Sequence, residues 1–142
     1  MNDIIDNLVK EIKIEHKPEY INHWKIQSYQ YAIEIESSGI THISSFLVEK
    51  KRARILTINA SRIQFNKIEL MYIFSLESIH KNLLIVLRSW ISAVNSEIQS
   101  ITPIIPAANF FEREISEMVG VQFIGHPTPY RLILPYEWPK TT

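Results

Sequence analysis

Hydrophobic residues recur with helical spacing near the start of the chain and alternate with polar residues further on. In residues 2–14 apolar side chains lie three or four positions apart, and Asp3 and Asp6 stand where a helix dipole favours acids. This pattern predicts a short amphipathic helix, which Pro18 ends. Residues 28–36 alternate, with Tyr29, Tyr31, Ile33 and Ile35 on one face, which predicts a half-buried strand.

A second helix and three further strands are predicted in the middle of the chain. Residues 40–51 repeat apolar side chains on one helical face and end in a basic run that suits a helix C-terminus. Three short runs rich in Ile, Leu, Val and aromatic residues then predict strands over residues 54–60, 67–76 and 82–90. The short segment between the last two suits a hairpin loop.

The last predicted helix, residues 107–119, is bounded by residues that favour helix ends. Pro106 suits the first position, where its missing N–H is no loss, and Gly120 suits the position just past the end. We expect one stripe of this helix to face the core and a charged belt to lie beside it. The stripe is Ala108, Phe111, Ile115 and Met118, and the belt is Glu112, Arg113 and Glu114.

These segments predict an α+β fold: a single domain with a mainly antiparallel four-stranded sheet, helices packed on one face and an extended Pro-rich C-terminal tail. The strand order does not follow from the pattern. We divide the chain into an α+β domain over residues 1–120 and a tail over residues 121–142. Prolines interleaved with aromatic residues suit an extended tail that docks on a partner subunit.

Composition narrows the function classes. The 142 residues suit one domain, and 15 basic against 15 acidic residues give no overall positive field, so we expect no nucleic-acid partner. The absence of cysteine excludes disulfides, cysteine-ligated clusters and thiol nucleophiles. Residues 1–13 lack the features of a signal peptide, and charges interrupt the apolar stretch 68–91, so we expect a cytoplasmic protein with peripheral membrane contact.

The sequence offers no convergent catalytic group. Only three glycines are present, without a phosphate-binding loop, and the histidines lack metal-ligand spacing, so we predict no catalytic, cofactor-binding or metal site. Glu112 and Glu114 could act as an acid–base pair, but successive helical positions point apart; we expect ion pairs, with Glu112 reaching Arg131 or a partner's arginine. His126 could carry protons, although its Gly-His-Pro turn favours capping of a loop carbonyl.

Four segments near the C-terminus resemble the signature of the complex I 30-kDa subunit family, which includes the C subunits of NADH-quinone oxidoreductases and also supplies a subunit of membrane-bound nickel-iron hydrogenases. They are Pro106-Ala-Ala-Asn-Phe-Phe-Glu-Arg-Glu114, Met118-Val-Gly-Val-Gln-Phe123, Gly125-His-Pro127 and Arg131-Leu-Ile-Leu-Pro135. These residues span about the last quarter of the chain, and the first hundred agree with the family only in the order of their elements. In complex I members an acidic residue usually follows the His-Pro turn, where this chain has Thr128.

The resemblance implies a structural and assembly subunit that binds no cofactor, in the hydrophilic arm of a membrane-bound oxidoreductase on the cytoplasmic face of the membrane. Its partners would be the large catalytic subunit, 49-kDa-like or hydrogenase large subunit, and a cluster-bearing small subunit; any nickel-iron centre or iron-sulfur clusters would lie in these. The end at Thr142 favours the hydrogenase branch slightly over NADH/quinone oxidoreductases. The residues expected at the subunit interface are Phe111, Glu112, Arg113, Glu114, His126, Tyr130, Arg131 and Trp138.

Two other classes of function stay open at this point. A free-standing α+β module could capture a peptide or small molecule with its aromatic tail, and would show a closed apolar pocket. A small enzyme would need a cleft lined by convergent titratable groups, which the sequence does not indicate.

Overall fold

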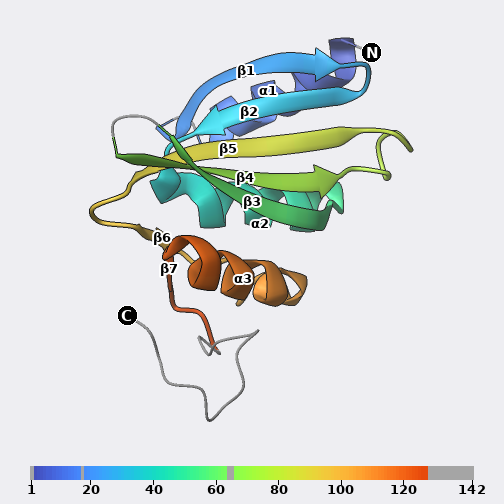
Figure 1. Ribbon diagram of the computed structural model, residues 1–142. Coiled ribbons are helices and arrows are strands. Elements are labelled where there is room, and N and C mark those ends of the chain that lie inside the picture. The colour runs from blue at the N-terminus through green and yellow to red at the C-terminus, as the bar shows by residue number, and fades with distance from the viewer. Residues whose placement is uncertain (1, 17, 64–65, 128–142) are drawn as a thin grey trace.

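The computed structural model of the protein describes residues 2–16, 18–63 and 66–127. Two helices, α1 (Asn2–His16) and α2 (Ile40–Lys51), lie together on one face of a sheet, and a third, α3 (Asn109–Val119), lies beside one edge of it (Figure 1). All three helices were predicted. Among the described helices, none is long and apolar enough to cross a membrane.

The main sheet has five strands in the order β1-β2-β5-β4-β3. They are β1 (Tyr20–Gln27), β2 (Gln30–Ile35), β3 (Arg54–Ile63), β4 (Lys67–Ser75) and β5 (Leu84–Ser92). Neighbours are antiparallel except β2 and β5, which run parallel. The predicted α+β class with a mainly antiparallel sheet is confirmed, as is the hairpin between β4 and β5.

The prediction of four strands is wrong because it omitted β1. This strand lies at the edge of the sheet, and its side chains are exposed or half-buried on both faces, so its sequence does not alternate between apolar and polar residues. Tyr29, which was assigned to the next strand, lies instead in the tight turn before β2 with φ +62°. A tyrosine gives no sequence signal for a turn that usually takes Gly or Asn.

The core fills the space between the sheet and the two helices that cover it. Ile12 of α1 and Ile43 and Leu47 of α2 are fully buried against side chains such as Ile33 and Leu87 from the central strands. An ion pair of 2.8 Å between Lys51 Nζ and Glu11 Oε1 joins the two helices at the surface. Packing therefore makes the helix-covered face of the sheet the inner one.

The chain after β5 folds back along the edge of the main sheet. Two three-residue strands, β6 (Glu97–Gln99) and β7 (Gln122–Ile124), pair in parallel, and a 3-10 turn, η2 (Pro106–Ala108), leads directly into α3. Strand β7 falls within the segment that was predicted to be a loop-like tail, and Val121 and Phe123 there are buried. The rest of the predicted tail, residues 128–142, lies outside the described residues.

Helix α3 is turned differently from its predicted orientation. Met118, expected to face the core, is 71% exposed, whereas Glu112, expected in the charged belt, is fully buried. The inward side runs through Ala108, Glu112, Ile115 and Val119, a spacing of four, three and four residues that also matches a helical face. An acidic side chain can occupy that face only where donors surround its carboxylate.

Candidate functional site

The segments that carry most of the predicted interface residues meet around helix α3. Pro106 stands at the start of η2, and Gly120 takes φ +88° at the end of α3, so both helix ends form as the sequence indicates. Arg62 on β3 donates from Nη2 to the carbonyl oxygen of Val119 at 2.9 Å, which fastens the end of the helix to the edge of the sheet. These features define both ends of α3 and its attachment to β3.

Glu112 lies at the centre of this junction, and its carboxylate accepts three hydrogen bonds from one short segment. Ser100 Oγ and Thr102 Oγ1 donate to Oε1 at 2.5 and 2.6 Å, and the backbone N–H of Ile101 donates to Oε2 at 2.8 Å. Ser100 also donates its backbone N–H to the carbonyl of Ile124, at the end of β7, at 2.8 Å. Glu112 therefore holds together α3 and the connection that precedes it.

His126 approaches the same carboxylate from the turn after β7. Its Nε2 lies 3.8 Å from Glu112 Oε1 and 3.5 Å from the carbonyl oxygen of Asn109, and its side chain is 2% exposed. The imidazole thus packs against the start of α3. If the ring is protonated, it forms an ion pair with Glu112.

Tyr72 of β4 is the third titratable group near this carboxylate. Burial and, to a smaller degree, the negative charge of Glu112 raise the pKa of Tyr72 well above the ordinary value. Its hydroxyl has no hydrogen-bond partner among the described residues. The carboxylate, the imidazole and the phenol are all buried, and together they form a junction between α3, the turn after β7 and strand β4.

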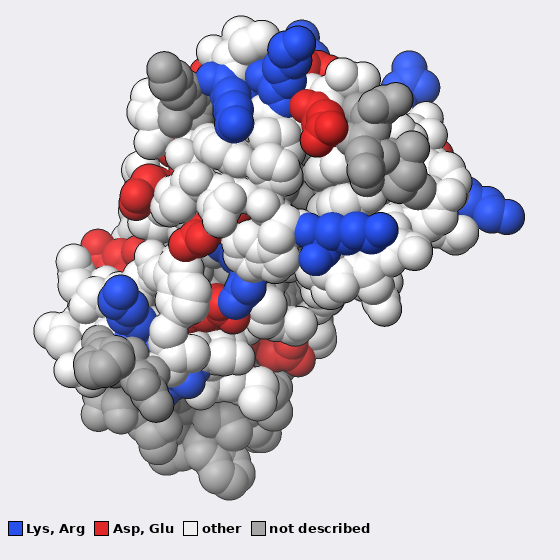
Figure 2. Space-filling view, turned by 90° about the horizontal axis from the view of Figure 1, so that it is seen from above, with Lys and Arg blue, Asp and Glu red and all other residues white. Residues whose placement is uncertain are grey.

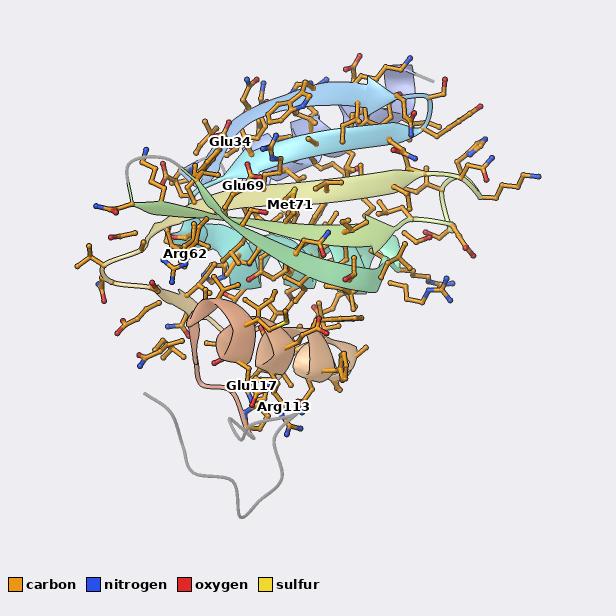
Figure 3. All side chains as sticks on the ribbon, viewed as in Figure 1. Glu34, Arg62, Glu69, Met71, Arg113 and Glu117 are labelled. Carbon is orange, nitrogen blue, oxygen red and sulfur yellow. The ribbon has the colours of Figure 1, made fainter. Side chains whose placement is uncertain are left out.

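The neighbours of Glu112 point elsewhere. Figure 3 shows Arg113 and Glu117 on the side of α3 that faces away from the sheet. Phe111 is half-buried against the core, and Glu114 lines a shallow groove between α3 and β3 together with Met118. Adjacent members of the predicted charged belt thus separate: Glu112 is fully buried, whereas Arg113 and Glu114 are half-buried and point in other directions, as the 100° rotation between helical positions requires.

The interface prediction as a whole remains a prediction. The structure places Phe111, Glu112, Arg113, Glu114 and His126 around one helix, with Glu112 engaged by its own chain. The other predicted interface residues, Tyr130, Arg131 and Trp138, lie outside the described residues. Within the described part, no group of three or more histidine, aspartate or glutamate side chains could hold a metal ion.

Sequence reasoning missed a second cluster, on the face of the sheet away from α1 and α2. Arg88 on β5 lies over the rings of Trp24 and Trp90, 5.2 and 5.9 Å from their centroids, and forms an ion pair with Glu69 on β4. Trp90 Nε1 donates to Glu34 Oε2 on β2 at 3.1 Å. The alternation of Val86, Arg88 and Trp90 with buried positions along β5 was the available signal.

Surface charges elsewhere are mixed. On the face seen in Figure 2, basic and acidic side chains are interspersed without a large region of one sign. That distribution agrees with the equal numbers of basic and acidic residues in the chain. This face therefore has no extended positive potential that would attract a polyanion.

A protein-family model described as "Respiratory-chain NADH dehydrogenase, 30 Kd subunit" matches residues 33–141. The C subunit of the NADH-quinone oxidoreductase of Ruegeria sp. is 28% identical over 141 residues, 96% of this chain and 68% of the relative. The mitochondrial NADH-ubiquinone oxidoreductase 30.4 kDa subunit of Neurospora crassa is 29% identical over 84% of this chain, and the matched part spans 43% of that relative's length. Hydrogenase-4 component G of Escherichia coli is 41% identical over 49% of this chain, and the matched part spans 12% of that relative's length.

Two solved structures share the fold. A protein from the membrane-bound sulfane sulfur reductase, an archaeal respiratory membrane complex, superposes with a TM-score of 0.73 at 18% identity and covers 94% of this chain and 75% of its own. A trypsin-resistant fragment of Nqo5 superposes with a TM-score of 0.71 at 14% identity, over 87% of this chain and 98% of its own. At these identities the superpositions establish the fold alone.

Proposed function

The chain belongs to the respiratory-chain NADH dehydrogenase 30 Kd subunit family, and from this membership we propose that it is a supporting subunit of a membrane-bound oxidoreductase complex related to complex I. The observation that carries the proposal is the family match over residues 33–141, which takes in strands β3, β4 and β5 of the main sheet and the α3 junction. The subunit binds no cofactor of its own in this proposal. Its mechanism is packing and ion pairing, which hold other subunits in register.

The large catalytic subunit and a cluster-bearing small subunit are the proposed partners. The α3 junction supports this reading because Glu112 closes its interior, while half-buried Arg113 lies on the side of α3 that faces away from the sheet and half-buried Glu114 lines the groove beside β3. A rigid element with charged side chains on its outer side suits recognition of a neighbour, because its side chains lose little conformational entropy on binding. Any nickel-iron centre or iron-sulfur clusters lie in those neighbours.

The type of complex is a finer question within the proposal. Relatives named as quinone oxidoreductase subunits and one named as a hydrogenase component are both similar to this chain, and their identities do not separate the two branches. The proposal therefore covers both types of complex. The proposal also places the subunit peripherally, on the cytoplasmic face of the membrane.

Deletion and complementation test this role. The gene for this chain is removed from its host, and membranes are resolved on native gels with detection of the large subunit. We expect the assembled complex to disappear and to return when the full chain is supplied. Undiminished assembly without the chain would show that it supports no complex, and the role would then have to be abandoned.

A further inference from the structure

The face of the main sheet opposite α1 and α2 carries side chains typical of an interface. In Figure 1 these helices lie behind the sheet, and no described helix covers its front. Along β5, half-buried Val86, Arg88 and Trp90 point to this front while the residues between them are buried in the core. Tryptophan and arginine are the side chains most enriched where binding energy concentrates in protein interfaces.

The front of the sheet is held in one arrangement before any partner binds. The guanidinium of Arg88 lies over both tryptophan rings and pairs with Glu69, and Glu34 accepts the indole N–H of Trp90. Figure 3 shows Glu34 and Glu69 toward the same end of the sheet. Because four strands contribute to these contacts, the rings are pre-organised, and docking on them does not have to order them.

A hollow of about 590 Å³ opens beside Trp90 at that end of the sheet. Its charged lining consists of Glu34, Glu36 and Lys67, two carboxylates against one ammonium. Neither Glu36 nor Lys67 forms an ion pair with another described residue. The remaining lining residues are Ile21, Ile35 and Ile63, of which Ile21 is 44% and Ile63 38% exposed.

We propose that this hollow receives an arginine or lysine side chain of a neighbouring protein subunit, presented on a segment whose apolar residues cover Ile21 and Ile63. The excess of carboxylates attracts a cation, and the ring of Trp90 offers a face on which it can lie. Arg88, which does not line the hollow, already shows that this ring accepts a guanidinium. The inference rests on the proposed function, because it assigns one surface to a partner within the complex.

Site-specific photo-crosslinking locates the partner. Benzoylphenylalanine replaces Ile63 in the tagged full chain expressed in its host, and Ile14, which is 76% exposed on α1, is the matched control position. After irradiation, mass spectrometry identifies the crosslinked peptides. We expect Ile63 to capture a partner peptide with a basic residue close to the attachment point, and Ile14 not to capture that peptide. A second copy of this chain, a peptide without a basic residue, or the same peptide from both positions would overturn the proposal.

Charge reversal tests the chemistry of the hollow. Glu36 is exposed, so Glu36→Lys should leave the melting curve unchanged while about tenfold less of the partner stays bound to the tagged chain in washes at moderate salt. Glu97→Lys, at an exposed position of β6, is the matched control and should retain the partner. If Glu36→Lys retains as much partner as the unchanged chain, the hollow does not receive a cation. If the unchanged chain itself recovers no partner, the proposed function fails and not this inference alone.

Discussion

Glu112 shows how a single residue can fix the relation between two segments of the chain. Its carboxylate is fully buried, and three donors from residues 100–102 surround it. A charged group can be buried at tolerable cost only when hydrogen bonds replace its lost water. At the scale of the residue, the carboxylate of Glu112 thus helps to hold the fold together.

Glu112→Gln should destabilise the chain. The substitution keeps the size of the side chain but replaces a charged acceptor with an amide that can accept at one atom only, so at least one buried donor loses its partner. We expect the free energy of unfolding to fall by about 2–3 kcal/mol, measured by urea denaturation.

Glu114→Gln on the same helix is the control, because Glu114 is half-buried and lines a surface groove. Its effect should stay within about 0.5 kcal/mol. Equal losses in the two variants would contradict the central role given to the Glu112 carboxylate.

Tyr72→Phe should leave stability unchanged or raise it slightly, because it removes a buried hydroxyl with no hydrogen-bond partner among the described residues.

The raised pKa of Tyr72 makes the stability of the chain depend on pH. Above about pH 10 the unfolded chain releases this proton while the folded chain retains it. The free energy of unfolding is therefore unaffected by this group below that pH and falls as the pH rises above it. The unfolding free energy of Tyr72→Phe, followed from about pH 8 to about pH 11, should therefore fall less steeply than that of the unchanged chain; parallel curves would contradict this explanation.

At the scale of elements, helix α3 depends on how it ends. Gly120 adopts a left-handed conformation and donates its N–H to the carbonyl of Ser116 at 3.1 Å. The chain then turns back so that Val121 and Phe123 enter the core. The end of the helix thus determines where β7 and the His126 turn are placed.

Gly120→Ala should cost about 1–2 kcal/mol of unfolding free energy. A Cβ at this position would meet no atom within 4 Å, so the loss comes from the backbone conformation alone. Urea denaturation measures the loss, and Ser116→Ala, at an exposed position of the same helix, is the control and should change stability by less than about 0.5 kcal/mol. A neutral Gly120→Ala would mean that the left-handed helix end carries no strain for alanine.

Local sequence patterns predicted some elements and missed others for identifiable reasons. The alternating apolar residues Tyr31, Ile33 and Ile35 of β2 and the repeated apolar residues of α2 are buried, so the sequence pattern predicted them. Ala32, between two of these β2 residues, is buried as well. Strand β1 has no such contrast at the sheet edge. Strands β6 and β7 exist because residues 97–99 meet residues 122–124 across the fold, a pairing that no short window of sequence contains.

Local sequence likewise predicted some features of the candidate site and missed others. The ends of α3 at Pro106 and Gly120 could be predicted from local chemistry. The burial of Glu112 could not, because its donors lie ten to twelve positions away, although Ser100 and Thr102 at alternate positions are suitable donors. The cluster around Arg88 depends on the strand order, which brings β1, β2, β5 and β4 side by side and which the pattern left undetermined.

At the scale of the whole molecule, α1 and α2 cover one face of the sheet, no described helix covers the other, open face, and α3 lies at the edge of the sheet (Figure 1). The covered face supplies the core. The open face and the outer side of α3 carry the charged and aromatic side chains that we assign to partners. A supporting subunit needs this combination of a closed interior and fixed outer surfaces.

Arg113→Ala should weaken assembly more than it weakens the isolated domain. Arg113 stands on the outer side of α3, so its loss should lower the melting temperature by less than about 3 °C. The amount of large subunit that co-purifies should fall at least about threefold, as expected for a lost interfacial charge. A melting temperature that falls by more than about 3 °C together with the loss of co-purified subunit would contradict an interface role for Arg113.

Affinity purification of the tagged chain from its native membrane in mild detergent, with mass spectrometry and metal analysis of the recovered proteins, tests the central claim most directly. We predict that a large catalytic subunit is recovered with the chain, together with nickel and iron if the complex is a hydrogenase, or with iron and quinone-reductase subunits if it is a complex I. Recovery of the chain alone from the soluble fraction would contradict the account and would favour a free-standing binding module.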